Sequence, residues 1–125
     1  MKVSINDRFE VLYFYERLPD LTLKPLRIPQ PLDQIVEYLV SKYFVFLEER
    51  DQFKIYECNN PTEELKSVIK GISLISKKVD EMILSGKEDE AHKELQKVDE
   101  FLRNKALEDL KGVATYLNLL YISNL

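Results

Sequence analysis

The stretch that decides most of the fold is residues 61–91, PTEELKSVIKGISLISKKVDEMILSGKEDEA. Pro61 and Thr62 precede two glutamates, an order typical of a helix N-terminus, because threonine can cap the first turn and carboxylates are favoured at its partial positive charge. The apolar residues that follow recur every three or four positions, which indicates a helix that packs along one face. They are Leu65, Val68, Ile69, Ile72, Ile75, Val79, Met82 and Ile83. Ser85 and Gly86 are expected to end this helix, since glycine takes the left-handed conformation of a helix C-cap.

A second helix is predicted directly after Gly86. Glu88, Asp89 and Glu90 occupy its first turn, where acidic side chains are favoured. Its apolar stripe continues almost to the end of the chain, through Ala91, Leu95, Val98, Leu102, Ala106, Leu110, Val113, Leu117 and Leu120. The short connection predicts an antiparallel helical hairpin over residues 61–125, with a last helix that is about ten residues longer than its partner.

Residues 1–60 have a different composition and hold ten of the thirteen aromatic residues. Asn6 or Asp7 can cap a helix that runs from Arg8 to about Leu18. The apolar run at residues 11–15 also suits a strand, so the pattern leaves both alternatives open.

The four prolines that come next exclude a regular helix from Leu18 to Leu32. Proline lacks an N–H donor and biases the backbone of the preceding residue toward extended geometry. A helix is expected to begin at Pro31 or Leu32 and to end near Lys42. After it, apolar and polar residues alternate with a period of two. This predicts a β-hairpin over residues 43–58, with a polar turn at residues 49–52.

The order of these elements resembles a winged helix over residues 8–58, with a first helix, a linker, a second helix and a hairpin that ends in Phe53-Lys54-Ile55-Tyr56. The resemblance implies that the second helix and the hairpin contact DNA. Two features depart from the family. Residues 24–29 contain two prolines and leave space for at most one turn of the middle helix. Asp33 and Glu37 would repel phosphates at the start of the recognition helix.

The charge balance gives no overall attraction to nucleic acid or to an anionic membrane. The chain has 18 Lys and Arg against 22 Asp and Glu, a net charge of -4. No apolar run approaches the roughly 18 residues of a membrane span, and the N-terminus lacks the order of a signal peptide. We therefore expect a cytoplasmic protein without a membrane partner.

Residue types that carry chemistry are few and isolated. His92 is the single histidine and has no second ligand at metal-binding spacing. Cys58 is the single cysteine and has no base nearby in the sequence. The three glycines are too far apart to form a phosphate-binding loop. We predict no enzymatic activity, no catalytic residue, no cofactor and no metal, while carboxylates that converge only on folding remain the open alternative.

These patterns predict a mainly α protein with one small β-hairpin. Residues 1–60 would form an aromatic-rich, winged-helix-like α/β lobe, and residues 61–125 a helical hairpin packed with it as one unit. The expected function is a non-enzymatic protein-interaction module: a small subunit, adaptor or inhibitor whose partner is another protein or a second copy of the chain. The alternative is a winged-helix transcriptional regulator that binds DNA and dimerises through its C-terminal helices.

The end of the last helix is the most apolar part of the C-terminal half and must cover another surface. It either completes the core against the N-terminal lobe or forms a partner interface at Tyr116, Leu117, Leu120 and Tyr121. Under the DNA-binding alternative, the residues that contact nucleic acid would be Arg27, Lys42, Arg50 and Lys54.

Overall fold

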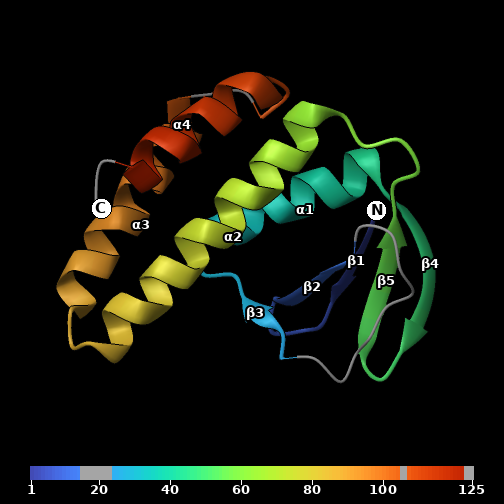
Figure 1. The fold of residues 1–125 in the computed structure, drawn as a ribbon, viewed down its shortest axis with the longest axis horizontal. Coiled ribbons are helices and arrows are strands. Elements are labelled where there is room, and N and C mark those ends of the chain that lie inside the picture. Colours follow the sequence, from blue (N-terminus) through green and yellow to red (C-terminus); the bar gives the residue numbers. More distant parts are fainter. Residues whose placement is uncertain (15–23, 105–106, 123–125) are drawn as a thin grey trace.

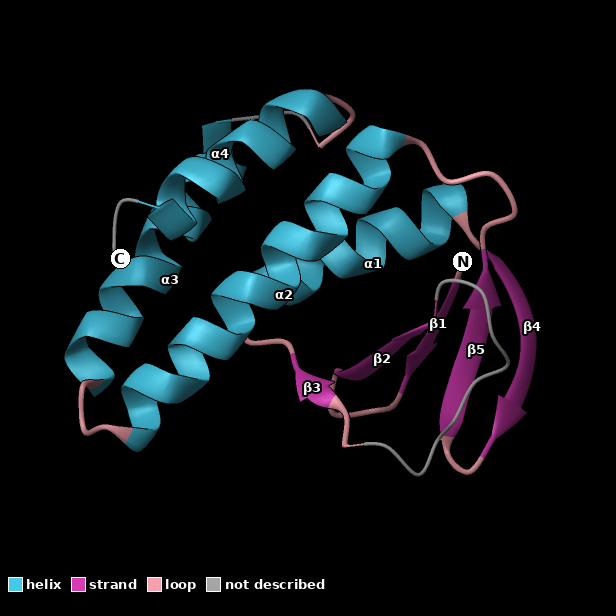
Figure 2. Ribbon diagram, viewed as in Figure 1, coloured by secondary structure: helices cyan, strands magenta, loops and turns pink. Residues whose placement is uncertain are grey.

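The computed structural model describes residues 1–14, 24–104 and 107–122. Within these ranges the chain forms a five-strand antiparallel sheet and four helices in three layers: the sheet, then α1 and α2, then α3 and α4 (Figure 1, Figure 2). The elements are β1 (Lys2–Ile5), β2 (Glu10–Phe14), β3 (Leu26–Arg27), α1 (Leu32–Tyr43), β4 (Val45–Arg50), β5 (Phe53–Glu57), α2 (Glu63–Leu84), α3 (Glu88–Asn104) and α4 (Leu110–Ile122). The protein is therefore a mixed α/β protein, and the prediction of one small hairpin understated its sheet.

The sheet has the strand order β3-β2-β1-β5-β4, with β1 at its centre. Val3 of β1 lies opposite Tyr13 of β2 and Tyr56 of β5. Val3 is 1% exposed and belongs to the core beneath the helices. Its neighbour Ser4 is also buried, and because side chains alternate along a strand it lies on the opposite face. Both faces of the central strand are therefore shielded from solvent.

The predicted first helix is wrong in the residues that the structure describes, because Glu10–Phe14 is strand β2. Residues 15–18 of that prediction lie outside the described ranges. Asn6 does cap a turn, but it is the turn between β1 and β2: its Oδ1 accepts hydrogen bonds from the backbone N–H groups of Arg8 and Glu10, each at 3.0 Å. An asparagine that precedes an apolar run satisfies a hairpin turn as well as a helix N-terminus.

The predicted helix after the prolines and the hairpin that follows it are both confirmed. Helix α1 spans Leu32–Tyr43, and β4 pairs with β5. The turn between these strands places Asp51 and Gln52 at φ 51° and 70°. Two consecutive left-handed residues give the backbone twist that a two-residue hairpin turn needs, so the hairpin forms without the usual glycine.

Helix α2 is confirmed together with both of its predicted ends. The Thr62 hydroxyl accepts a hydrogen bond from the N–H of Leu65 at 3.1 Å. Gly86 has φ 79°, and the N–H of Lys87 donates to the carbonyl of Met82 at 2.8 Å. These bonds satisfy orphan backbone groups at the two ends of the helix.

The predicted long last helix is wrong, because it is two helices. Helix α3 ends at Asn104 and α4 begins at Leu110. Asp109 caps the new helix: its Oδ1 accepts from the N–H of Gly112 at 3.0 Å. Helix α4 then returns beside α3 and packs along α2, so residues 61–125 form three helices where a hairpin of two was predicted (Figure 1).

Helix α2 lies close to α4 at Gly71. A Cβ atom at this position would lie only 2.9 Å from the Cβ of Leu117. Glycine therefore allows the two helices to pack closely, and Leu117 is fully buried in the contact.

Candidate functional site

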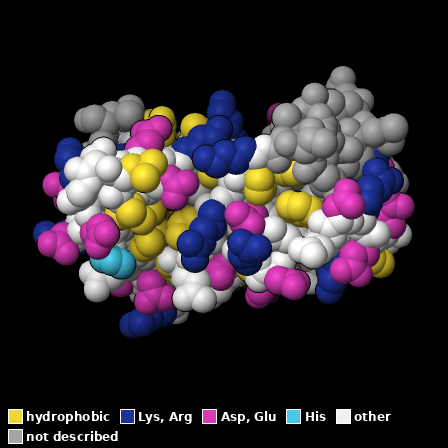
Figure 3. Space-filling view, turned by 90° about the horizontal axis from the view of Figure 1, so that it is seen from below, with side chains coloured by type: hydrophobic (Ala, Val, Ile, Leu, Met, Phe, Trp, Pro, Cys, Tyr) yellow, Lys and Arg dark blue, Asp and Glu magenta, His cyan; other side chains and the backbone are white. Residues whose placement is uncertain are grey.

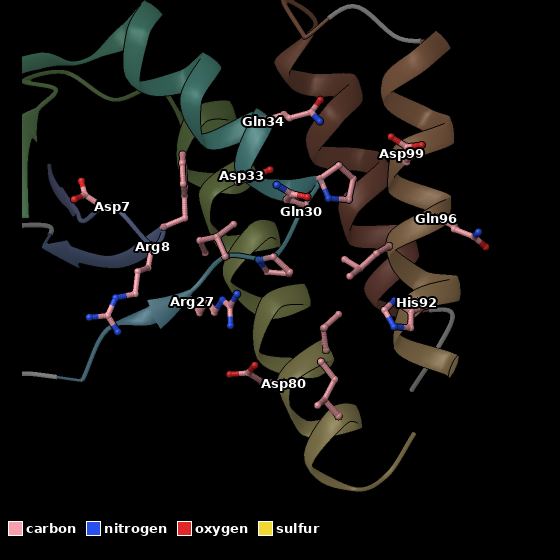
Figure 4. Close-up of a pocket in the computed structure, with 17 residues that line it drawn as sticks. Asp7, Arg8, Arg27, Gln30, Asp33, Gln34, Asp80, His92, Gln96 and Asp99 are labelled. Carbon is pink, nitrogen blue, oxygen red and sulfur yellow. The ribbon is translucent and has the colours of Figure 1, made fainter. Parts of the chain in front are cut away.

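A groove of about 1000 Å³ lies where the strand side of the molecule meets helices α2 and α3 (Figure 4). Four segments form its walls: the β1–β2 turn, the chain from β3 into the first turn of α1, the C-terminal half of α2, and one face of α3. Its lining residues are Asp7, Arg8, Phe9, Arg27, Ile28, Pro29, Gln30, Pro31, Asp33, Gln34, Val79, Asp80, Ile83, His92, Leu95, Gln96 and Asp99.

The floor of the groove is apolar and partly open to solvent. Ile28 and Val79 are buried, whereas Leu95 is half-buried and Ile83 is 45% exposed. Figure 3 shows hydrophobic side chains gathered on this face near the histidine, with Lys, Arg, Asp and Glu around them. Concave surfaces with an apolar floor and a few polar groups are the usual form of a binding site.

The β1–β2 turn holds Phe9 against the floor in an unusual backbone conformation. Phe9 has φ 55°, in the left-handed region that side chains with a Cβ atom rarely adopt. Its N–H donates to the carbonyl of Asn6 at 3.1 Å, and its own carbonyl accepts from the N–H of Ile28 at 2.9 Å. These bonds fix the turn to the segment that leaves β3, so the strand-side wall of the groove is braced by backbone contacts.

Charged and polar side chains form the two rims. Arg8, Arg27 and Asp80 lie along one rim in Figure 4, and His92 and Asp99 lie along the other, on α3. The Asp99 carboxylate forms an ion pair with the guanidinium group of Arg103, one helical turn away, at 2.8 Å. The rims therefore offer charges of both signs to a ligand.

Asp33 contributes a half-buried carboxylate to the groove. It lies in the first turn of α1 beside Gln30, and its side chain is half-buried. Its Oδ1 is shielded from solvent and has no hydrogen-bond partner among the described residues. Burial raises the pKa of this carboxyl group, although backbone N–H groups of Asp33 and Gln34 partly oppose the shift.

The residues considered for catalysis or metal binding lie apart. His92 is exposed on α3, and Cys58 lies beyond the end of β5, where its carbonyl accepts a hydrogen bond from the Met1 amino group at 3.0 Å. Over the described ranges, no three His, Cys, Asp or Glu side chains are grouped closely enough to hold a metal ion.

The residues predicted for a partner interface contribute to contacts within the chain. Leu117 is fully buried and Leu120 is 6% exposed. The Tyr116 ring stacks on Phe101 with 3.9 Å between ring centroids, and its hydroxyl donates to the carbonyl of Lys97. These contacts are with α2 and α3, whereas the core alternative had placed this segment against the N-terminal lobe.

The four residues predicted for nucleic-acid binding are spread over the sheet and the last turn of α1. Arg27 lies on β3 and Arg50 on β4, at opposite edges of the sheet. Arg50 is paired with Glu48, and Lys42 donates to the hydroxyl of Tyr38. Lys54 lies on β5, next to the β4 edge.

The groove was not predicted, because each of its residues looks like an ordinary surface or core position in its own segment. The one available signal was Asp33, a carboxylate directly after the buried Leu32 at the start of an apolar helix. No pattern in the sequence indicates that the start of α1 lies opposite α3.

None of the helices in the described part of the chain combines the length and the apolar composition needed to cross a membrane. Comparisons of the chain with protein-family models, with curated proteins and with solved structures found no match.

Proposed function

We propose that the protein is a non-enzymatic interaction module that binds a segment of another protein in the groove between α1, α2 and α3. The segment would place apolar side chains on the floor and a lysine or arginine against Asp33. The observation that carries the proposal is the Asp33 Oδ1 atom, which is out of contact with solvent and unpartnered among the described residues.

A shielded carboxylate oxygen without a partner has lost its hydration and gained nothing in return. A cationic group that reaches Asp33 would restore a charge-assisted hydrogen bond, which contributes about 1.5–3 kcal/mol. The same contact would favour the ionised form and lower the raised pKa of the carboxyl group. Because the Asp33 Oδ1 atom is shielded from solvent and unpartnered among the described residues, binding of a lysine or arginine beside it is favoured.

The open end of the groove adds apolar surface. Ile83 is 45% exposed and its neighbour Leu84 is 87% exposed, at the C-terminal end of α2. Covering a large aliphatic side chain contributes about 1.5–3 kcal/mol when it becomes fully buried. Together with the net charge of -4, this surface suits a segment that is both apolar and basic.

Selection of random peptides displayed on phage against the immobilised protein tests this function. We expect the enriched peptides to combine apolar residues with lysine or arginine. Asp33→Asn should weaken their binding about 10- to 100-fold in a fluorescence anisotropy titration, the factor that corresponds to one charge-assisted hydrogen bond.

The matched control is Asp89→Asn, which removes an exposed carboxylate from the first turn of α3, outside the groove. It should leave the affinity unchanged. A selection that enriches no peptide family, or enriched peptides that bind Asp33→Asn as well as the parent, would rule out this use of the groove.

The alternative function, a winged-helix DNA-binding regulator, is supported by one observation, a helix followed by a hairpin over residues 32–57. The separation of Arg27 from Arg50 across the sheet gives it less support than the groove gives protein binding. An anisotropy titration with random duplex DNA at about 50 and about 200 mM salt tests it, because phosphate contacts lose affinity steeply as salt rises.

A further inference from the structure

Asp33 differs from the other charged side chains of the groove in its surroundings. Asp99 is half-buried as well, but it is paired with Arg103. Within the part of the chain that the structure describes, no ion pair involves Asp33. The remaining charged or titratable groups on the four walls are all exposed, and so is the acidic residue one turn further along α1. They are Asp7 and Arg8 of the β1–β2 turn, Arg27 of β3, Asp80 of α2, His92 of α3 and Glu37 of α1.

The shielded position of Asp33 favours its neutral form. The Oδ1 atom has no contact with solvent, so the ionised carboxylate has lost part of its hydration. Burial is the main cause that raises the pKa of this group. An interval of pH therefore extends from the ordinary aspartate value of about 4 up to the raised pKa, and within it part of the folded molecules carries an uncharged Asp33.

We propose that the groove takes up its basic segment with release of the Asp33 proton, so that acidification drives the segment out of the groove. The inference rests on the proposed function, in which a lysine or arginine lies against Asp33. A neutral carboxyl group offers no charge to that cation. Lysine and arginine stay protonated at acid and neutral pH, so the proton lost on binding comes from Asp33 and passes to solvent. The carboxylate that remains forms the ion pair.

Binding and protonation are coupled in both directions. A cation that binds the ionised form lowers the pKa of the carboxyl group, and protonation of the group lowers the affinity by the corresponding factor. The release of one proton changes the affinity by at most about tenfold per pH unit. Above the raised pKa the carboxyl group of the free chain is already ionised, so the affinity should become constant there.

His92 is a second group whose charge depends on pH. It lies on α3, across the groove from Asp33 (Figure 4). A histidine gains a positive charge as the pH falls, and a positive charge on this rim would also repel a basic segment. The two contributions have to be separated with one variant each, Asp33→Asn and His92→Gln.

Isothermal titration calorimetry of the full chain tests the proposal. The probe is a lysine-containing peptide from the phage selection, without Asp, Glu or His and blocked at both termini, so that the peptide itself does not titrate between about pH 4 and 7. The affinity of the parent should rise about 10- to 100-fold over this range, by the factor of one charge-assisted hydrogen bond. Titrations in buffers of different ionisation enthalpy should show a proton released on binding in the steep part of this rise.

The two variants assign the proton. Asp33→Asn should bind with constant affinity, equal to that of the parent at about pH 4, and should release no proton. His92→Gln should keep most of the rise. Circular dichroism at each pH verifies that all three proteins are folded.

The outcomes separate this inference from the proposed function. If Asp33→Asn weakens binding at pH 7 but the affinity of the parent does not fall toward pH 4, the groove binds as proposed and the proton coupling is wrong. A rise that persists in Asp33→Asn, or that disappears in His92→Gln, belongs to another group and also overturns the coupling. A selection that enriches no peptide removes the proposed function and this inference together.

Discussion

Replacing Gly71 with alanine tests the close packing of α2 against α4. The new Cβ would lie 2.9 Å from the Cβ of Leu117 and 3.3 Å from its Cδ1. Carbon atoms in ordinary contact are about 3.5–4.0 Å apart. The Leu117 Cβ is fixed to its own backbone and cannot rotate away, so the two helices must separate by about 0.6–1 Å at this point.

Two opposing effects set the size of the change. Overpacking of a close-packed core costs about 1–3 kcal/mol, whereas alanine gains about 1 kcal/mol over glycine in a helix interior. We expect a net loss of about 1 kcal/mol in the free energy of unfolding, which corresponds to a decrease in Tm of about 3–6 °C for a domain of this size.

Urea unfolding followed by circular dichroism measures this change directly. Gly86→Ala separates packing from backbone effects, because its Cβ would meet nothing within 4 Å while its φ of 79° still disfavours alanine. Gly86→Ala should lose about 1 kcal/mol through its backbone conformation alone. If Gly71→Ala is more stable than the parent by the full helix-propensity gain, then the contact with Leu117 does not constrain the helices and the reasoning is refuted.

Three further substitutions address the groove, the hairpin and a helix cap. Burial raises the pKa of the Asp33 carboxyl group, so the folded chain binds this proton more tightly than the unfolded chain does. The resulting stabilisation is complete below the ordinary aspartate pKa of about 4, and it is lost as the pH rises through the raised pKa. Asp33→Asn should therefore unfold at a higher urea concentration than the parent at pH 7, and the gap should close toward pH 4; a constant gap would contradict this origin. Gln52→Gly should raise the free energy of unfolding by about 0.5–1 kcal/mol in urea titrations, because glycine adopts the observed φ of 70° without strain. Thr62→Ala should lower the thermal midpoint, with a loss of about 1 kcal/mol from the missing bond to the Leu65 N–H, and an unchanged midpoint would show that the cap contributes nothing.

Local signals in the sequence were sufficient where each element is determined by its own residues. Thr62 and Gly86 marked both ends of α2 because capping depends on a few neighbouring atoms. Helix α1 and the β4–β5 hairpin followed from a change in hydrophobic period.

Local signals failed where distant contacts decide. The run that includes Glu10–Phe14 fits a helix or a strand, and its pairing with β1 selects the strand. The break between α3 and α4 is invisible to periodicity, because the apolar stripe passes in phase from Leu102 to Val113 across it. Asp109, which caps α4, was its only marker.

The groove could not be predicted for a related reason. Its walls come from four segments, and the β1–β2 turn and α3 are separated by most of the chain. The exposed strand β4 was predicted as half of a hairpin, but its place at the edge depends on β1 lying beside β5. Which surfaces are open is therefore a property of the assembled fold.

The central position of β1 has a consequence for the order of folding. Its pairing with β2 closes a short turn, and helices α2 and α3 meet across Gly86, so both units need only local contacts. The pairing of Val3 with Tyr56, in contrast, closes a loop of roughly fifty residues that contains all of α1. We expect the local units to form within microseconds, and the joining of β1 to β5 to be the slow step that commits the chain to its native topology.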